Sequence, residues 1–211
     1  MKLYSENNEL YTVLNKLGDL VLLNVLFVVS CIPVITIGAA LTSMYSVTNK
    51  MVQQENIKIF SDYKNAFIKN FKQATLIWIF ILVAIFILIA DIQILGVFQN
   101  SILLGLILGV ILLLFMITSY IFPLIACFYN TTFMYIKNAL ILACLNIVKT
   151  LVILVVNVLP FLVLFTDGIL AQFGYFIYLL IGFSATSLLV MTLLAKVFRK
   201  YVNKEMQEKE N

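Results

Sequence analysis

The chain alternates between long apolar stretches without a charged side chain and short segments in which the charged residues gather. No charge occurs between Asp19 and Lys50, and residues 74–90 are again free of charge. About 20 consecutive apolar residues are enough for a helix to cross the hydrocarbon core of a bilayer. Stretches of this kind predict five spans, at approximately 20–47, 74–90, 102–126, 150–165 and 173–195.

Within each stretch the apolar residues are continuous rather than alternating with polar ones, which favours helices over the strands of a membrane barrel. Hydrophobic residues make up 63% of the chain and charged residues 11%, whereas roughly a quarter of the residues in a soluble domain are charged. We therefore predict an all-α polytopic membrane helix bundle with the lipid bilayer as its main partner. One integral membrane domain is expected over 1–211, with a tail at 196–211.

The distribution of Lys and Arg predicts the orientation, because basic residues gather in the loops that stay in the cytoplasm. The connections at 91–100 and 166–172 contain neither Lys nor Arg, so we expect them outside. The basic segments at 50–72 and 137–149 are expected in the cytoplasm, together with the C-terminal tail. Anionic lipid headgroups account for the net positive charge better than nucleic acid does, because the chain has no separate basic domain.

The first apolar stretch is longer than a single crossing needs, and Pro33 and Gly38 lie near its middle. Proline removes a backbone donor and clashes with the preceding turn, so we expect a helix break or kink there. We favour a single kinked helix with the N-terminus outside. The alternative is a pair of half-helices that enter and leave on the cytoplasmic side. Because the apolar stretch continues past Cys31, we expect a retained helix rather than a cleaved leader.

The first basic segment has the pattern of an amphipathic helix. Its aromatic residues recur at steps of three and four, which places them on one helical face, and lysines lie beside and opposite that face. We predict a helix that lies along the membrane surface or bends directly into the second span, and that serves as a connector more than as a partner site. The residues of this predicted membrane-surface helix are Phe60, Tyr63, Phe67, Phe71, Lys64, Lys69 and Lys72.

Small and polar residues within the spans predict contacts between helices. Gly105 and Gly109 are four positions apart, as are Gly182 and Thr186, and such pairs allow two helices to approach closely. Asn24 and Asn157 are predicted to form hydrogen bonds between helices or to line a polar path.

Few residues in this chain are suited to catalysis or metal binding. Histidine is absent, and Cys31, Cys127 and Cys144 do not have the spacing of a metal site. The commonest zinc ligand and the usual general base are therefore missing, and the cysteines are expected to be inert buried thiols. The spans also lack paired aspartates. We predict no catalytic residue, no metal site and no cofactor, and expect that the protein is not an enzyme.

Several blocks of the sequence resemble the YesL family of bacterial membrane proteins. The blocks are Ile32–Ala40 with its continuation Leu41–Thr48, and Asn70–Trp78; the pair Asn138–Ala139 fits the same pattern. The resemblance implies a multi-pass protein of the bacterial cytoplasmic membrane. The family has no established function or functional residues, but its genes often lie beside sugar-uptake genes, which implies a link to carbohydrate import.

Two functions are compatible with these features. The first is a non-enzymatic accessory or regulatory component that contacts subunits of a sugar transporter. The second is a transporter of a small solute such as a sugar, or the permease subunit of such a transporter. The spans contain no ionisable group that would mark a proton path. Neither cytoplasmic segment contains the Glu-Ala-Ala loop by which permease subunits of ATP-driven importers dock their ATPase. These two absences favour the accessory component.

Overall fold

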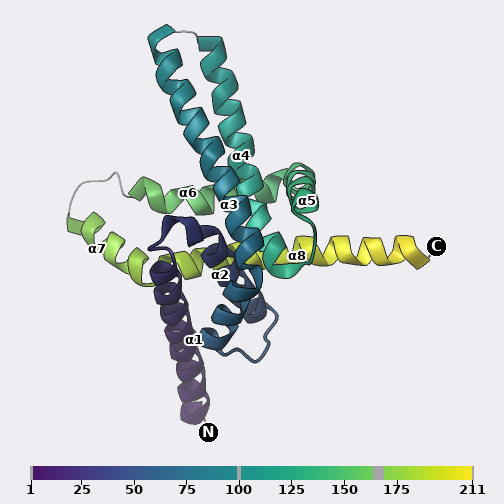
Figure 1. The fold of residues 1–211 in the computed structure, drawn as a ribbon. Coiled ribbons are helices and arrows are strands. Elements are labelled where there is room, and N and C mark those ends of the chain that lie inside the picture. Colours follow the sequence, from purple (N-terminus) through teal and green to yellow (C-terminus); the bar gives the residue numbers. More distant parts are fainter. Residues whose placement is uncertain (1, 99–100, 164–168, 211) are drawn as a thin grey trace.

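The computed structural model of the protein describes residues 2–98, 101–163 and 169–210 (Figure 1). Every regular element in these ranges is helical, which confirms the predicted all-α fold for the described part of the chain. The elements are α1 (Lys2–Ser30), η1 (Val34–Thr36), α2 (Ile37–Val52), α3 (Ile59–Phe98), α4 (Ser101–Cys127), α5 (Thr132–Leu145), α6 (Ile147–Val163), α7 (Ile169–Ile177), η2 (Tyr178–Gly182) and α8 (Phe183–Glu210).

Four helical stretches among the described residues are long and apolar enough to cross a membrane. They are Val13–Ser30, Ile59–Gln93, Ile102–Cys127 and Gly174–Tyr201. The stretches Thr132–Leu145 and Ile147–Val158 pass the same test together, although they meet at an angle of 105°, and they raise the number to five if they count as one broken span.

The first apolar stretch forms two helices, so the single kinked helix that we favoured over 20–47 is wrong. The α-helical path ends at Ser30, Pro33 precedes the short 3-10 helix η1, and α2 begins at Ile37. Gly38 lies in the first turn of α2 rather than in the break. Proline explains the end of α1, because it can neither donate a backbone hydrogen bond nor fit against the preceding turn.

α2 folds back along α1 instead of continuing in its direction. The Ser184 hydroxyl donates to the Leu20 carbonyl at 2.8 Å, and the Ser187 hydroxyl lies 3.0 Å from that of Thr48. The two serines are less than one helical turn apart on α8. In a continuous helix Leu20 and Thr48 would be about 42 Å apart. Leu23 and Phe27 also belong to the same apolar cluster as residues of α2. The two helices therefore form a hairpin.

Three of the carbonyl groups at this break have side-chain partners within the protein. The Thr36 hydroxyl oxygen lies 2.6 Å from the Ser30 carbonyl oxygen and 2.7 Å from the Pro33 carbonyl oxygen, and its one hydrogen is shared between these two acceptors. The Trp78 indole of α3 donates to the Val34 carbonyl at 2.8 Å. Such satisfaction is required wherever a helix is interrupted in an apolar medium. The break is therefore built into the fold by two side chains on different helices.

α2 packs closely against α3, and Gly38 makes this approach possible. A Cβ atom at Gly38 would lie 2.5 Å from the Ala74 carbonyl oxygen and 2.6 Å from the Trp78 Cβ atom. Around this contact, Tyr45 of α2 and Ile77 of α3 enter the main apolar core with the fully buried Tyr120 of α4. α2 is thus the central helix of the bundle, with α1, α3 and α8 around it.

α3 and α4 form a long hairpin whose far half extends beyond the other helices (Figure 1). Most of the described side chains there are apolar, and many are exposed, for example Phe86 and Leu106. Gly105 and Gly109 lie on this half, and a Cβ atom at either would meet no heavy atom within 4 Å. The predicted close helix packing at these two glycines is not seen within the described chain, because the Cβ side of each faces open space.

The last three helices contain two irregular points. α5 and α6 meet at the sharp bend around Asn146, where the Thr150 hydroxyl donates to the Ala143 carbonyl at 2.8 Å. η2 is one turn of π-helix between α7 and α8. α8 then continues to Glu210, so the segment 196–210, which we expected as a tail, is part of this helix.

The close approach at Gly38 leads to a prediction about stability. The substitution Gly38→Ala is expected to destabilise the protein by about 1–3 kcal/mol, because backbone and Cβ atoms must move to admit the methyl group. In a protein of this size this lowers Tm by roughly 2–4 °C for each kcal/mol. Thermal unfolding of the detergent-solubilised protein measures the shift.

The matched control is Gly105→Ala in the exposed half of the α3–α4 hairpin. Here the added methyl group meets open space and reduces the flexibility of the unfolded chain. We expect an unchanged or slightly higher Tm. Equal losses at both positions would contradict the close packing of α2 on α3.

Candidate functional site

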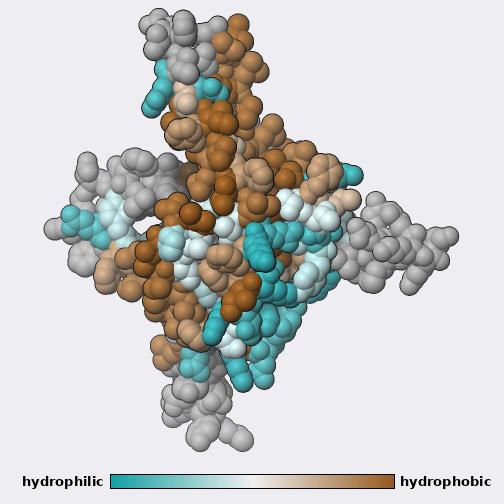
Figure 2. Space-filling model, in the orientation of Figure 1, coloured by the Kyte–Doolittle hydropathy of each residue, from teal (hydrophilic) through white to brown (hydrophobic). Residues whose placement is uncertain are grey.

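Polar side chains gather over one part of the surface, where α3 begins, whereas the α3–α4 hairpin is covered by hydrophobic residues (Figure 2). A cavity of about 340 Å³ opens in this polar region. Its walls come from the last turns of α2, the connection after α2, the first turns of α3 and the connection between α4 and α5. We call this cavity the polar basin; its polar lining includes Asn49, Lys50, Glu55, Asp62, Asn65 and Lys69.

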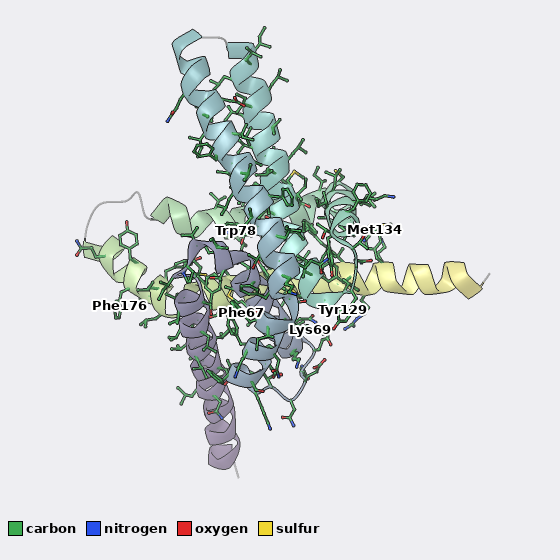
Figure 3. All side chains as sticks on the ribbon, in the orientation of Figure 1. Phe67, Lys69, Trp78, Tyr129, Met134 and Phe176 are labelled. Carbon is green, nitrogen blue, oxygen red and sulfur yellow. The ribbon has the colours of Figure 1, made fainter. Side chains whose placement is uncertain are left out.

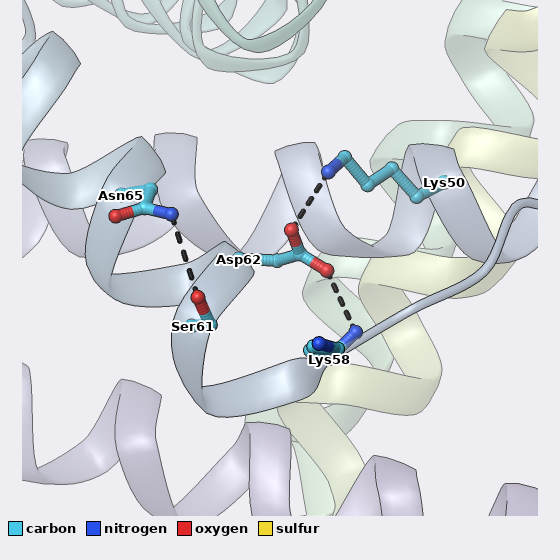
Figure 4. A network of polar contacts seen from close by, with 5 residues as sticks. All are labelled: Lys50, Lys58, Ser61, Asp62 and Asn65. Carbon is cyan, nitrogen blue, oxygen red and sulfur yellow. Dashed lines mark hydrogen bonds and ion pairs between the residues drawn. The ribbon is translucent and has the colours of Figure 1, made fainter.

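An ion pair joins the two helices that form the basin. Lys50 Nζ of α2 lies 2.8 Å from Asp62 Oδ1 of α3 (Figure 4). The second carboxylate oxygen, Asp62 Oδ2, accepts the backbone N–H of Lys58 at 2.8 Å. A carboxylate in the first turn of a helix is also stabilised by the helix dipole. Asp62 thus fixes the start of α3 against the end of α2.

The pKa of Asp62 reflects this environment. Burial by itself would raise the pKa of this carboxyl, but the hydrogen bond from Lys50, the backbone N–H of Lys58 and the charges of both lysines outweigh it. The net result is that the pKa of Asp62 lies below its ordinary value. The carboxylate is therefore charged throughout the physiological pH range.

The opposite wall of the basin is the connection between α4 and α5. The Lys69 ammonium lies 4.3 Å from the centre of the Tyr129 ring, a cation–π contact (Figure 3). The Tyr135 hydroxyl donates to the Phe128 carbonyl at 2.6 Å, and the Gln73 side chain donates to the Asn130 carbonyl at 2.9 Å. These bonds hold the connection in place although it has no regular structure.

A second cavity of about 550 Å³ adjoins the basin and shares Asn49, Cys127 and Phe128 with it. Its remaining walls are Gln53 and Gln54 after α2 and the stretch of α8 that contains Arg199. The two cavities together form a concave polar surface with amide, carboxylate, ammonium and guanidinium groups. Such a surface can bind polar groups from a solute or from another protein through hydrogen bonds and ion pairs.

The predicted membrane-surface helix is the beginning of α3 and continues without interruption into the apolar stretch. Tyr63 is buried and Phe67 half-buried, and both pack beside α1 and α2. Successive rings of the aromatic face lie near each other, with centroids 5.5 Å apart for Phe67 and Phe71. Phe60, in contrast, is exposed, as are Lys64, Lys69 and Lys72. Only the middle of the aromatic face therefore packs on the bundle, because Phe71 is also exposed, while Lys69 lines the basin.

Asn24 does not line a polar path, so this part of the prediction is wrong. Its side chain is fully buried and is inserted into the π-helical turn. Asn24 Oδ1 accepts the Ser184 N–H at 2.9 Å, and Asn24 Nδ2 donates to the Leu179 carbonyl at 2.6 Å. These are the two groups that a π-helix pairs directly, so the amide of α1 takes the place of one backbone hydrogen bond. Asn24 forms the interhelical contact that was the other alternative.

Asn157 and the pair Gly182–Thr186 have different environments. Asn157 is half-buried in α6 and makes no side-chain hydrogen bond to another described residue. Gly182 is buried beneath the Tyr178 ring, and the Thr186 hydroxyl donates to the Gly182 carbonyl at 2.7 Å. The space left by the missing side chain of Gly182 is therefore filled by the Tyr178 ring of the same helical segment and not by the backbone of a second helix.

Sequence reasoning missed most of the basin. Asn49, Asp62 and Asn65 were not singled out, and Tyr129 lies in a connection without a motif. One signal was available, because Lys50 and Asp62 stand on either side of the short connection between two helices, where opposite charges often pair. Among the described residues, no group of three or more Cys, Asp and Glu side chains is placed to hold a metal ion.

Comparison with known proteins gives one match. Residues 20–92 match a family described as "Protein of unknown function, DUF624". No curated protein and no solved structure matches the chain. The matched region runs from the middle of α1 through the break and α2 into α3. It therefore contains the α1–α2 hairpin and the Lys50–Asp62 pair of the basin.

Loss of the buried Asn24 amide is expected to destabilise the protein. Asn24→Ala leaves the Leu179 carbonyl and the Ser184 N–H without a partner in an apolar interior, at a cost of about 1–2 kcal/mol. Asn157→Ala is the matched control, and its Tm should change by no more than the equivalent of about 0.5 kcal/mol. Thermal unfolding in detergent compares the two variants. A larger loss for the control would contradict the role of Asn24.

The Lys50–Asp62 pair is expected to make stability depend on pH. Because the pKa of Asp62 is lowered by folding, its contribution is present at neutral pH and disappears as the pH falls through the folded-state pKa. Asp62→Asn should lower stability by up to about 1 kcal/mol at pH 7, as for other partly exposed pairs.

Melting curves of Asp62→Asn and the unaltered protein should converge when the pH is lowered below about 4. Glu55→Gln removes a basin carboxylate that forms no ion pair with a described residue, and it serves as the control. A constant difference between Asp62→Asn and the unaltered protein from pH 7 to pH 3 would exclude the ion pair as the cause.

Proposed function

We propose that the protein is a membrane-embedded accessory or regulatory component, without catalytic activity of its own, that binds a subunit of a carbohydrate-uptake system through the polar basin. The resemblance to the YesL family supports the link to carbohydrate uptake. The match of residues 20–92 to DUF624 agrees with this resemblance, because it covers both of the longer blocks that carry it. The proposed location is the bacterial cytoplasmic membrane, with the basin and the C-terminus in the cytoplasm.

The shape of the basin is the observation that favours binding over transport. The cavity opens at the surface, and its inner wall contains the buried side chains of Ala66 and Ile125. Ile125 belongs to the main apolar core, which also contains the buried Tyr45 and Ile121. The polar lining of the basin is thus backed at Ala66 and Ile125 by buried apolar side chains. This arrangement favours a site that receives a group from outside over a path that conducts a solute.

One feature supports the alternative of a small-solute transporter. A volume of about 340 Å³ falls in the range of small-molecule sites, which begins at about 300 Å³. The basin also offers amides, a carboxylate and the Tyr129 ring, groups that can bind a polar solute. However, Asn24, the polar residue that was expected to extend a path into the bundle, is occupied by hydrogen bonds within the protein.

Site-specific photo-crosslinking in living cells tests the proposed binding. A benzophenone side chain is placed at Tyr129, which is 77% exposed at the basin, or at Phe86, which is 73% exposed on the α3–α4 hairpin. The Tyr129 position is expected to crosslink to a membrane-transporter subunit, identified by mass spectrometry. The Phe86 position faces the apolar surroundings and should give no crosslink to that subunit.

Two lysine variants show whether the basin itself is required. Lys69→Ala removes a basin cation. Because the loss of one cation contact weakens binding by about threefold or more, the yield of the crosslinked product should fall by a similar factor. Lys64→Ala removes an exposed lysine of the same helix outside the basin and should leave the yield unchanged. Absence of any subunit at Tyr129, with normal sugar uptake after deletion of the gene, would overturn the proposal. Flux of a labelled sugar into liposomes containing the purified protein alone would favour the transporter instead.

A further inference from the structure

The turn between α1 and α2 combines an apolar surface with several carbonyls whose hydrogen-bond partners lie inside the protein. Ile32, Val34 and Ile35 are 76%, 58% and 57% exposed. The carbonyls around them accept hydrogen bonds from the Thr36 hydroxyl and the Trp78 indole. A turn in water normally presents polar side chains and leaves its carbonyls to the solvent. This turn has the opposite character, which suits hydrocarbon.

We infer that α1 and α2 form a re-entrant hairpin whose turn, residues 31–36, is inserted in the hydrocarbon of the bilayer and whose two open ends lie on the same side of the membrane. The occupant of the exposed apolar turn is therefore the lipid acyl chains. The hairpin topology does not depend on any partner of the polar basin.

The fold-back of α2 provides the first support. Asn24 of α1 and Thr48 of α2 both bind the first turns of α8, through Ser184 and Ser187. The two helices consequently run in opposite directions from one short stretch of α8. A chain that enters the bilayer through α1 leaves it again through α2, because the turn lies at the far end of both helices.

The distribution of charge provides an independent argument. With a single crossing in this region, Lys2 and Lys16 would lie opposite to all other basic residues. With the hairpin, Lys2 and Lys16 lie on the same side as the five lysines between residues 50 and 72. The connection at 91–100, at the far end of α3, contains neither Lys nor Arg. The hairpin therefore agrees with the preference of basic residues for the cytoplasmic side in this part of the chain.

Labelling of single cysteines on known membrane faces tests the topology. The starting variant carries Cys31→Ala, Cys127→Ala and Cys144→Ala, and one cysteine is then introduced by Lys16→Cys, Asn56→Cys or Gln93→Cys. All three positions are exposed in the structure, in α1, in the connection after α2 and at the far end of α3. A maleimide that cannot cross membranes is applied to intact spheroplasts and to inverted vesicles, with denatured samples giving total reactivity.

The expected result is that Lys16→Cys and Asn56→Cys react in inverted vesicles and Gln93→Cys reacts in spheroplasts. If the Lys16→Cys variant were labelled in spheroplasts, as Gln93→Cys is expected to be, the chain would cross the membrane completely between residues 16 and 56. This result would overturn the hairpin. Lys16→Cys that reacts only after denaturation would overturn it as well, because the residue would then lie within the bilayer. If the Gln93→Cys and Asn56→Cys variants were labelled from the same side, α3 would not cross the membrane, and the topology would be contradicted.

Trp78 reports on the depth of the turn, because it is the one tryptophan in the sequence and its Nε1 atom lies 2.8 Å from the Val34 carbonyl oxygen. In liposomes, its fluorescence should be quenched by phospholipids brominated on their acyl chains and not by iodide in the buffer. Quenching by iodide comparable to that of a soluble tryptophan derivative would place the turn in water and exclude its insertion.

Discussion

The fold depends on side chains that satisfy the backbone wherever a helix is interrupted. In an apolar surrounding an unpaired N–H or carbonyl costs several kcal/mol, so an interruption persists only if another part of the protein supplies a partner. Asn24 supplies it at the π-helical turn, Thr36 and Trp78 at the break before α2, and Thr150 at the bend between α5 and α6. At each irregular point, a side chain from the same or another helix is therefore bonded to the interrupted backbone.

Asn24 illustrates how one amide connects distant parts of the chain. By accepting from Ser184 and donating to Leu179, it holds α1 on the junction of α7 and α8. Thr48 then binds Ser187 a short distance further along α8, which brings α2 to the same junction. α3 follows because Gly38 allows it to approach α2 at van der Waals distance. A few small polar or glycine positions thus help to set the arrangement of the central helices, beside the bulky side chains of the apolar core.

The same arrangement separates two surfaces with different properties. The far half of the α3–α4 hairpin and the turn at 31–36 present apolar side chains, which suit acyl chains. The polar basin forms where the end of α2, the start of α3 and the connection after α4 come together, and the Lys50–Asp62 pair holds two of these elements. Anchoring in the bilayer and binding of a polar partner are therefore assigned to opposite parts of one bundle in the function that we propose.

The sequence by itself determined the helical class and an interruption near Pro33, because these follow from hydrophobicity along the chain and from the chemistry of proline. It also indicated that Asn24 would bond between helices. Only the tertiary structure decided that α2 folds back on α1, that Gly38 is a packing position while Gly105 is not, and that Asp62 and Tyr129 meet at one basin. The direction that a helix takes after a break, and the contacts between residues far apart in the sequence, depend on which helices pack together. The local pattern of the sequence does not contain this information.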